Sequence, residues 1–549
     1  MLTAALKENL SFMVVEVARQ LDETFDFLAN GGVAAFQKIN SRDDYIDNLK
    51  TVIENCCFTT LSEAKSITQR ERDSIRATHT ICVNLERIGD FCVSAADQLH
   101  YLNNHAILQY FDYQRIFDIL VEHLQAVLPV LQNGDMGKAL AICRAENQID
   151  VIYKENFDRI MEALRRGKEI ENLITVLFIF RYLERMGDSL LNIGEALLLS
   201  ILGEKIKIEQ FQALEETLNK SGLRSNLAEV EFSSILGSRS GCRIRKVQGH
   251  EEQPLLAPQT QSSIFKEGNK EKILTEKKNL ERWNEIFPGL TPRLFSHQES
   301  EETASLLVEF LPGHTLETIL LKDDSDELHT VWTPLKSTVL EIWHRTKKGN
   351  PVKANFIPQI MARMHSVLSV HPDFHRVRQD IGSSEVIPTD ELLAKCRHIE
   401  EKLAAPFSVF IHGDFNVNNI LYNAARERIQ LIDLYRSREA DYIQDVSVFI
   451  VSNFRQPVFQ THLRERLNWI TRNMYQMARE FAAEQGDETF EVRMALALAR
   501  SFYTSTRFEW NNDFAHEMFL RSHFLLEKVL AHEDKSWPTF SLPSGIMYY

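Results

Sequence analysis

His412-Gly413-Asp414-Phe415-Asn416-Val417-Asn418-Asn419 is the stretch of this 549-residue sequence that decides how its C-terminal half folds. Fourteen residues after Asn419, Asp433 ends the apolar segment Leu431-Ile432-Asp433. A transition state for phosphoryl transfer spreads negative charge over several oxygens, so a protein mainly has to place Mg²⁺ and accept the proton of the attacking hydroxyl. Asp414 is the candidate proton acceptor, while Asn419 and Asp433 offer the oxygen ligands that Mg²⁺ prefers. This pattern predicts phosphoryl-transfer chemistry.

Three short apolar runs surround these polar residues. Residues 407–411 precede the stretch, residues 420–422 follow it, and residues 429–432 come just before Asp433. Runs of this length and composition predict β-strands. The polar groups are therefore expected to gather at strand ends.

The same residues resemble the His-Gly-Asp-x-x-x-x-Asn catalytic loop, and the metal-binding Asp after it, of the aminoglycoside/choline phosphotransferase family. The resemblance implies a bilobal α+β, protein-kinase-like domain with ATP and Mg²⁺ as cofactors. It implies that Asp414 is the catalytic base and that Asn419 and Asp433 bind the metal. It also implies a small-molecule hydroxyl as acceptor, and leaves open whether this is an aminoglycoside, choline, ethanolamine, a sugar or an amino acid.

Two features beyond Asp433 bear on this resemblance. The run Leu434-Tyr435-Arg436-Ser437 departs from the family, in which a run containing Trp, Phe or Gly is common. Asp441 and Asp445 both resemble a later acid that braces the catalytic loop, and Asp445 matches it better. We therefore expect a structural role for Asp445.

A kinase also needs a strand lysine for the phosphates and a helical acid that holds it. Residues 262–268 are predicted as a strand that carries Lys266, and residues 270–287 as a helix with Glu276 on its apolar face. Because a buried acid needs a partner, we predict that Glu276 pairs with Lys266 and that both serve ATP binding. Two ordinary surface charges are the alternative.

Two further segments complete the predicted nucleotide site. Residues 306–313 resemble the hinge whose backbone usually meets adenine, and Glu309 within them is a candidate nucleotide contact. Residues 236–241, with glycines at both ends of Gly237-Ser238-Arg239-Ser240-Gly241, are a weaker candidate for the loop that covers the phosphates.

The first 220 residues contain a duplication. Leu85-Glu86-Arg87-Ile88-Gly89-Asp90 recurs as Leu183-Glu184-Arg185-Met186-Gly187-Asp188, at an offset of 98 residues. Apolar positions around both copies keep this offset and recur at helical spacing, so both copies are predicted to be amphipathic helices. These positions are Leu85, Ile88, Cys92, Ala95 and Leu99 in the first copy, and Leu183, Met186, Leu190, Ile193 and Leu197 in the second.

Pairs of acids four residues apart occur on each predicted helix and on a segment before it, so their carboxylates project from one side. Like charges at this spacing repel each other by a few tenths of a kcal/mol per pair, and a bound cation would compensate them. Oxygen ligands alone favour Mg²⁺, Mn²⁺ or Ca²⁺. The alternative is a solvated stripe neutralised by Arg87 and Arg185. The four candidate metal-binding pairs are Asp43 with Asp47, Glu86 with Asp90, Glu146 with Asp150, and Glu184 with Asp188.

The paired Glu-Arg-x-Gly-Asp helices resemble the PhoU family over roughly residues 1–215. The resemblance implies an all-α pair of three-helix bundles, iron or zinc bound by the acidic motifs, and a role in phosphate sensing. It also implies a phosphate transporter or sensor protein as partner, with peripheral contact at the inner face of the membrane.

Composition fits a multidomain globular chain with 44% hydrophobic and 25% charged residues. A net charge of −15 disfavours nucleic acid as a partner. Seven cysteines without a Cys-x-x-Cys pair argue against disulfides, and the first residues do not form a signal peptide, so we expect a cytoplasmic protein. The predicted domains are 1–218 (helical repeat), 227–313 (small lobe) and 314–535 (large lobe).

The sequence thus predicts a metal-binding helical regulatory domain fused to an ATP-dependent small-molecule phosphotransferase. The alternative is a non-catalytic nucleotide- or phosphate-sensing protein that acts through protein partners. A homo-oligomer is compatible with either, and nothing in the sequence selects the acceptor.

Overall fold

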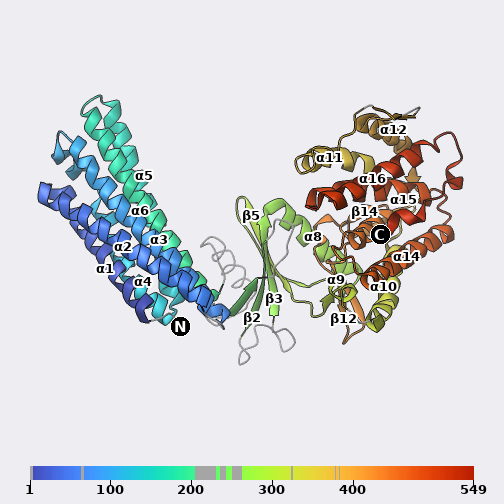
Figure 1. Cartoon of the computed structure of the whole chain (residues 1–549), viewed down its shortest axis with the longest axis horizontal. Helices are drawn as coiled ribbons and strands as arrows, with labels where there is room; N and C mark the ends of the chain where they lie inside the picture. Colours follow the sequence, from blue (N-terminus) through green and yellow to red (C-terminus); the bar gives the residue numbers. More distant parts are fainter. Residues whose placement is uncertain are drawn as a thin grey trace. The chain divides into compact units, whose positions relative to one another are not determined.

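A computed structural model describes residues 4–63, 67–203, 230–234, 243–249, 262–322, 325–377, 379–381 and 384–549 (Figure 1). The predicted linker at 218–226 and the predicted phosphate loop at 236–241 lie outside these residues. The chain divides into one unit of residues 1–267 with 296–298, and a second unit of residues 268–295 with 299–549.

The first unit begins with two sets of three long helices, as the resemblance to the PhoU family implies (Figure 1). The repeated motifs lie on α3 and α6, which pack against each other, while α2 packs on α3 and α5 packs on α6. The ten apolar positions shared by the two copies are all buried. The helices are α1 (Ala4–Asn30), α2 (Val33–Glu63), α3 (Gln69–Asp97), α4 (Gln114–Asn133), α5 (Met136–Arg165) and α6 (Ile170–Leu202), with 3-10 turns η1 (Gln98–Tyr101) and η2 (His105–Tyr110) after α3.

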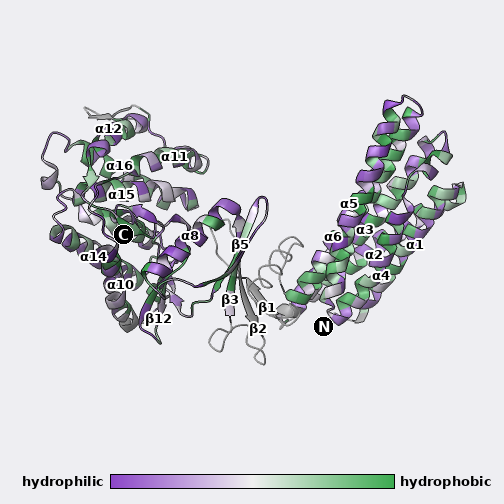
Figure 2. Ribbon diagram, turned by 180° about the vertical axis from the view of Figure 1, so that it is seen from behind, coloured by the Kyte–Doolittle hydropathy of each residue, from purple (hydrophilic) through white to green (hydrophobic). Residues whose placement is uncertain are grey.

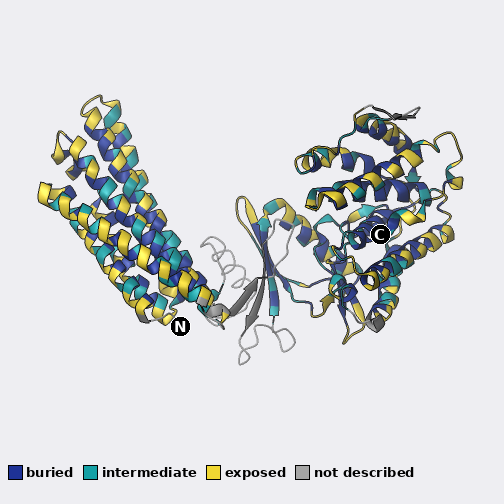
Figure 3. Ribbon diagram, in the orientation of Figure 1, coloured by how far each residue is buried: buried dark blue, intermediate teal, exposed yellow. Residues whose placement is uncertain are grey.

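Each of these helices buries one face and exposes the other, as Figures 2 and 3 show along the bundle. A close backbone approach fixes the pairing of α5 with α6. A Cβ placed on Gly194 would lie 2.5 Å from Cys143 Sγ and 3.0 Å from the Cys143 backbone nitrogen. Only glycine fits this contact between the two helices.

Strands and one helix follow the bundle. In the first unit, β1 pairs antiparallel with β2, and β2 pairs antiparallel with β3. Asn269 caps the next helix by accepting a hydrogen bond from the Lys272 backbone N–H, so α8 begins at Lys270 as predicted. The elements are β1 (Val230–Ser234), β2 (Arg243–Gly249), β3 (Ser262–Asn269), α8 (Lys270–Ile286), β4 (Leu294–Glu299), β5 (Thr303–Glu309) and β6 (His314–Thr315).

Helices make up most of the remaining chain. Helix α15 is central, because α11, α13 and α16 all pack against it (Figure 1). The helices are α9 (Leu316–Leu320), α10 (Ser325–Thr346), α11 (Phe356–Leu368), α12 (Thr389–Lys402), α13 (Ile443–Phe454), α14 (Thr461–Glu484), α15 (Phe490–Ser505) and α16 (Asn512–Leu530), with 3-10 turns η4 (Leu434–Arg436), η5 (Thr506–Phe508), η6 (Trp537–Thr539) and η7 (Ser544–Met547).

Short antiparallel strands between these helices frame the polar stretch. Strand β12 pairs with β13 and with β6, and β11 pairs with β14. The three strands predicted around the stretch are therefore confirmed as β11, β12 and β13. The remaining short strands also pair, β10 with β7 and β8 with β9. Their bounds are β7 (Val352–Lys353), β8 (Gln379–Ile381), β9 (Ser384–Val386), β10 (Ala404–Ala405), β11 (Val409–Ile411), β12 (Ile420–Asn423), β13 (Arg428–Leu431) and β14 (Arg438–Ala440).

A buried ionic group ties α13 to α15. The Arg493 guanidinium, which is fully buried, donates to the carboxylates of both Asp441 and Asp487. The hydroxyl of Tyr442 also donates to Asp487, at 2.7 Å. Two acids around one arginine satisfy the guanidinium without water, and breaking one partner would leave a buried charge uncompensated.

The six cysteines among the described residues are all free, which agrees with the expectation of no disulfides. In the same part of the chain, no helix combines the length and apolar character needed to cross a membrane.

Candidate functional site

The stretch at 412–419 forms the connection between β11 and β12, and Asp445 holds its start. The Asp445 carboxylate accepts the backbone N–H groups of His412, at 2.7 Å, and Gly413, at 2.8 Å. Burial raises the pKa of Asp445, while these two hydrogen bonds favour its charged form. Asp445 therefore acts from the first turn of α13 as the predicted brace of the loop.

His412 links the loop to the chain that leads into Asp433. Its Nε2 lies 2.9 Å from the Ile432 carbonyl oxygen, and its Nδ1 lies 3.3 Å from the backbone nitrogen of Asp414. Because a carbonyl oxygen can only accept, Nε2 is the ring nitrogen that donates to Ile432. His412 thus orients the loop.

Gly413 is required by a close backbone approach. Its φ of 84° lies in the left-handed region, and a Cβ there would be 2.2 Å from the Arg436 carbonyl oxygen. The absence of a side chain lets the segment after Asp433 pass directly beside the loop.

Asp414 and Asn419 lie together in this loop. The Asn419 Nδ2 donates to the Asp414 carbonyl oxygen at 3.0 Å. This bond uses the amide nitrogen, so the amide oxygen is the atom of Asn419 that can ligate a cation. The Asp414 carboxylate accepts from Arg436 Nη1 at 3.1 Å and more weakly from Asn416 Nδ2 at 3.4 Å.

Asp433 is positioned by the backbone on both sides of it. The N–H of Ile432 donates to the Asn419 carbonyl at 3.1 Å, and Asn279 Nδ2 of α8 donates to the Leu434 carbonyl at 2.8 Å. Between these bonds Asp433 adopts φ 63° and ψ 61°, a left-handed conformation that costs a non-glycine residue about 1 kcal/mol or more. Strain of this kind occurs at functional sites.

The predicted nucleotide-binding residues are placed as follows. Lys266 lies in β3 and Glu276 in α8, and both are buried, as predicted for Glu276. Their mutual pairing stays a prediction. The Glu309 carboxylate binds Arg293 through Nε, at 3.1 Å, and Nη2, at 3.2 Å, and the Glu309 N–H bonds the Arg293 carbonyl. The predicted adenine contact of Glu309 therefore rests on its backbone carbonyl.

Sequence reasoning missed the ion pair of Arg436 with Asp414. The sequence did contain a hint of this ion pair. The run after Asp433 differs from the one common in the family, and Arg436 is one of the residues that differ. Ser437 in the same run accepts from Trp283 Nε1 at 2.9 Å and donates to the His412 carbonyl at 3.1 Å. The run therefore connects α8 to the loop.

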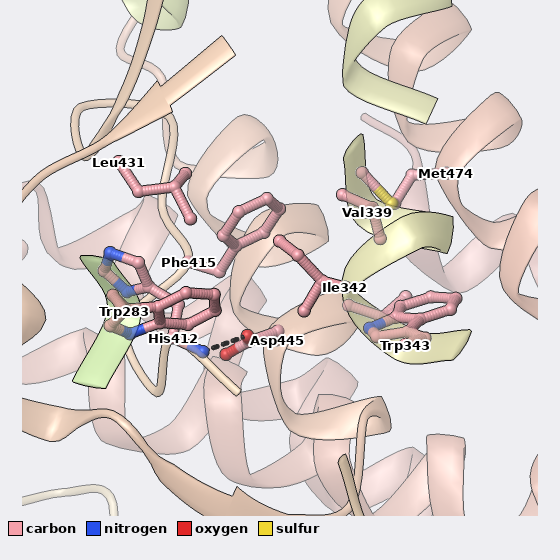
Figure 4. Close-up of a pocket in the computed structure, with 10 residues that line it drawn as sticks. Trp283, Val339, Ile342, Trp343, His412, Phe415, Leu431, Asp445 and Met474 are labelled. Atoms are coloured by element: carbon pink, nitrogen blue, oxygen red, sulfur yellow. Dashed lines mark hydrogen bonds between the residues drawn. The ribbon is translucent and has the colours of Figure 1, made fainter. Parts of the chain in front are cut away.

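A small pocket lies on the core side of the loop (Figure 4). Its lining includes His412 and Phe415 of the loop, Asp445 of α13, and the side chains of Trp283 and Trp343. Its walls are mostly apolar, and Asp414, Asn419 and Asp433 are not among its lining residues within the described chain. These three predicted site residues therefore lie outside this pocket.

The predicted acids of the first repeat gather into one group, the first acidic cluster, formed by Asp43 and Asp47 of α2 and Glu86 and Asp90 of α3. Carboxylate oxygens of Asp47, Glu86 and Asp90 lie within 4.8 Å of one another, a spacing that could hold a metal ion. Burial and the nearby Asp90, Asp47 and Glu86 raise the pKa of Asp43 to about 6. Lys50 Nζ lies 2.6 Å from Glu86 Oε1.

The second repeat is looser. Glu146 and Glu184 have raised pKa values, from burial first and then from neighbouring acids that include Asp150 and Asp188. Arg181 Nη1 lies 2.6 Å from Glu184 Oε1. Among the described residues these four acids do not bring three oxygens as close as the first acidic cluster does. A second metal site stays a prediction.

The alternative of a stripe neutralised by Arg87 and Arg185 stays open. Within the described part of the chain, neither arginine has a carboxylate within 4 Å, although both act on the acids at longer range. The cations in contact are Lys50 and Arg181. Lys50 lies on α2 seven residues after Asp43, on the same helical side, and this spacing could have revealed it.

Comparison with known protein families matches two separate parts of the chain. The PhoU domain family matches residues 10–99 and 113–197, and the ecdysteroid kinase-like family matches residues 328–482, which include Asp414, Asn419 and Asp433. A phosphate-specific transport system accessory protein PhoU homolog from Clostridium acetobutylicum is 26% identical over 174 residues, which cover 31% of this chain and 78% of that protein.

Two solved structures are also similar. An aminoglycoside phosphotransferase from Streptomyces rimosus has 16% identity and a TM-score of 0.33, and covers 58% of this chain and 98% of its own. A Plasmodium vivax ethanolamine kinase has 12% identity and a TM-score of 0.33, and covers 56% of this chain and 85% of its own. The chain therefore carries PhoU domains in its N-terminal half and an ecdysteroid kinase-like domain in its C-terminal half.

Proposed function

We propose that the C-terminal half transfers the terminal phosphoryl group of ATP to a hydroxyl of a small molecule. The observation that carries this proposal is the arrangement of Asp414 and Asn419 in one braced loop, with the strained Asp433 bonded to it through the neighbouring backbone. Domains 227–313 and 314–535 are proposed as the two lobes.

Asp414 is proposed as the base that accepts the proton of the acceptor hydroxyl. Its carboxylate accepts a hydrogen bond from Arg436 Nη1 at 3.1 Å, which fixes its orientation beside the loop. The oxygens of Asn419 and Asp433 suit Mg²⁺, which when bound neutralises charge on the transferring phosphoryl group. Lys266, Glu276 and the backbone at Glu309 are proposed to hold ATP.

The helical half, residues 1–218, is proposed as a regulatory domain. The first acidic cluster supports a bound divalent metal, because four acids share one place with a single lysine in contact. The kinship with accessory proteins of phosphate-specific transport supports a partner in phosphate transport or sensing, and a cytoplasmic protein that contacts the inner face of the membrane. Oxygen ligands suit Mg²⁺ or Mn²⁺, and the PhoU resemblance suggests iron or zinc.

The kinase proposal is tested with Asp414→Asn. The full chain is incubated with ATP, Mg²⁺ and a metabolite library, and phosphorylated products are identified by mass spectrometry. We expect product from the wild type, its disappearance without Mg²⁺, and a loss of at least about 100-fold in Asp414→Asn, as removal of a general base causes. The matched control is Asp373→Asn, at an exposed position of the same domain.

Full activity of Asp414→Asn would refute the role of this residue. Saturable ATP binding without any product in the wild type would instead favour the alternative, a non-catalytic sensor that passes the nucleotide state to a partner protein.

Metal binding is tested by elemental analysis of the purified chain and of the double variant Asp47→Asn/Asp90→Asn. We expect about one divalent ion per chain in the wild type and a loss in the double variant. Asp118→Asn, at an exposed position of α4, is the control and should keep the metal. Equal metal content in the wild type and the double variant would rule out the first acidic cluster as its site.

A further inference from the structure

Three arginines of the second unit, Arg436, Arg500 and Arg507, interact with Asp414, and two more, Arg363 and Arg455, lie near Arg507. This arginine cluster consists of Arg363 on α11, Arg436 on η4, Arg455 after α13, Arg500 on α15 and Arg507 on η5. Arg436 touches the Asp414 carboxylate at 3.1 Å, and Asp414 also acts electrostatically on Arg500 and Arg507. Arginines from segments that are far apart in the sequence therefore place positive charge near Asp414, the proposed base.

The packing of α13 on the loop at 412–419 places Arg455 near that loop, and Arg507 shares an aromatic contact with Arg455. Ser452, in the last turn of α13, accepts the backbone N–H of Val417 in the loop at 3.3 Å, and Arg455 follows three residues later. The Arg507 guanidinium carbon lies 4.2 Å from the centre of the Phe508 ring, and that of Arg455 lies 5.8 Å from the same ring. Two cations thus share one aromatic side chain beside the loop.

These arginines repel one another. Burial lowers the pKa of Arg507 to about 10, and Arg363, Arg436 and Arg455 act in the same direction. Burial likewise lowers the pKa of Arg500 to about 10. Both remain charged at neutral pH, so the folded chain holds these like charges together at a cost in free energy.

Asp414 and Asp445 act on Arg500, and Asp414 on Arg507, only at longer range, so these cations lack an anion in direct contact within the described part of the chain. There, no carboxylate lies within 4 Å of the guanidinium of Arg363, Arg500 or Arg507. Arg500 is only 8% exposed, yet its Nε has no hydrogen-bond partner and its Nη2 reaches only Ser447 Oγ, at 3.4 Å. Arg493 on the same helix is fully buried and binds two carboxylates. Buried cations are normally paired in this way.

We propose that the arginine cluster binds an anionic group of the phosphate acceptor, which is therefore a small phosphate ester or carboxylate that also carries the reacting hydroxyl. Guanidinium groups match both anions with paired hydrogen bonds. The net charge of −15 shows that these arginines do not simply follow from a basic composition. A neutral polyol would leave the charges uncompensated, and a cationic amino alcohol would be repelled. The inference rests on the proposed kinase function.

Inorganic phosphate is the probe for this site. It is titrated calorimetrically into the full chain while Mg²⁺ and a non-hydrolysable ATP analogue saturate the nucleotide site. We expect saturable binding to the wild type and binding weakened about tenfold or more in Arg363→Gln and Arg507→Gln, because each removes a charge-assisted hydrogen bond. Arg397→Gln is the control, since this arginine lies on α12 with Glu401 3.2 Å away, and should bind as the wild type does.

The proposal would be overturned if phosphate showed no saturable binding, or if the two cluster variants bound phosphate as tightly as the wild type does. Displacement of phosphate by the ATP analogue would also overturn it, because the arginines would then bind the nucleotide. Preferred phosphorylation of neutral or cationic library members would overturn it as well. Failure of the kinase function is distinct, because it shows as absent turnover while phosphate still binds and both cluster variants still weaken that binding.

Discussion

Glu400 gives a quantitative test of the large helical unit. It lies on α12, is 2% exposed, and accepts the backbone N–H of Phe356, at 2.7 Å, and of Ile357, at 3.2 Å, so it caps the first turn of α11. Burial raises its pKa from 4.5 to about 7 despite these hydrogen bonds. The folded state therefore binds more protons than the unfolded state between pH 4.5 and 7, and stability falls as the pH rises through this window.

The size of this effect follows from the shift. A difference of 2.5 pKa units between 4.5 and about 7 corresponds to about 3.4 kcal/mol in full, of which roughly 2.4 kcal/mol falls between pH 5 and 7.5. For a unit of this size that is a decrease in melting temperature of about 5 °C. Glu400→Gln keeps an acceptor for the helix but cannot ionise, so its dependence on pH should be flatter by this amount.

The assay is differential scanning calorimetry of the full chain at several pH values between 5 and 8. The difference between wild type and Glu400→Gln isolates this group, because all other titrating groups are shared. We expect the variant to be the more stable protein at pH 7.5 and the two to converge toward pH 5. Parallel profiles would show that Glu400 does not titrate in this range and would refute the reasoning.

Three further substitutions test other contacts. Asp445→Asn replaces the acceptor of two loop N–H groups by an amide that can accept from only one of them. We expect turnover to fall at least about tenfold in kinetic assays, and the free energy of unfolding to fall by roughly 2 kcal/mol in urea unfolding. An unchanged rate would show that this contact does not matter for turnover. Gly413→Ala places a Cβ 2.2 Å from the Arg436 carbonyl and should abolish most turnover in the same assay, whereas full activity would show that the loop can move aside. Gly194→Ala should destabilise the helical bundle by about 1–3 kcal/mol in thermal melts. The control Gly137→Ala should not, because a Cβ at that position meets only an ordinary contact. Equal melting temperatures of the two variants would contradict the close approach of the two helices.

Local patterns made the elements of this fold readable from the sequence. Helix α8 was predicted at 270–287 and spans 270–286, because apolar residues at helical spacing and a capping Asn269 both act within a few residues. The duplicated helices were predicted for the same reason, and their shared apolar positions are buried. The loop at 412–419 is readable from the sequence because its polar residues are concentrated in eight consecutive positions.

Contacts between distant segments were not readable in this way. Lys50 and Glu86 are 36 residues apart, and Arg436 and Asp414 are 22 apart, so no local periodicity joins them. The two-residue strands β6, β7 and β10 exist only through their pairing, since they are too short to carry a pattern. The arginine cluster draws on residues from 363 to 507, and only the packing of α11, α13 and α15 brings them together.

The buried group of Arg493, Asp441, Asp487 and Tyr442 constrains how this domain can diverge. Replacing one charged member leaves another charge buried without a partner, which lowers stability. Exchanging all the charged members together for apolar residues of similar volume avoids this loss of stability. Intermediate sequences should therefore be rare, and these positions are expected to covary as a block among homologues: the arginine accompanied by both aspartates in some lineages, and hydrophobic side chains at all three places in others.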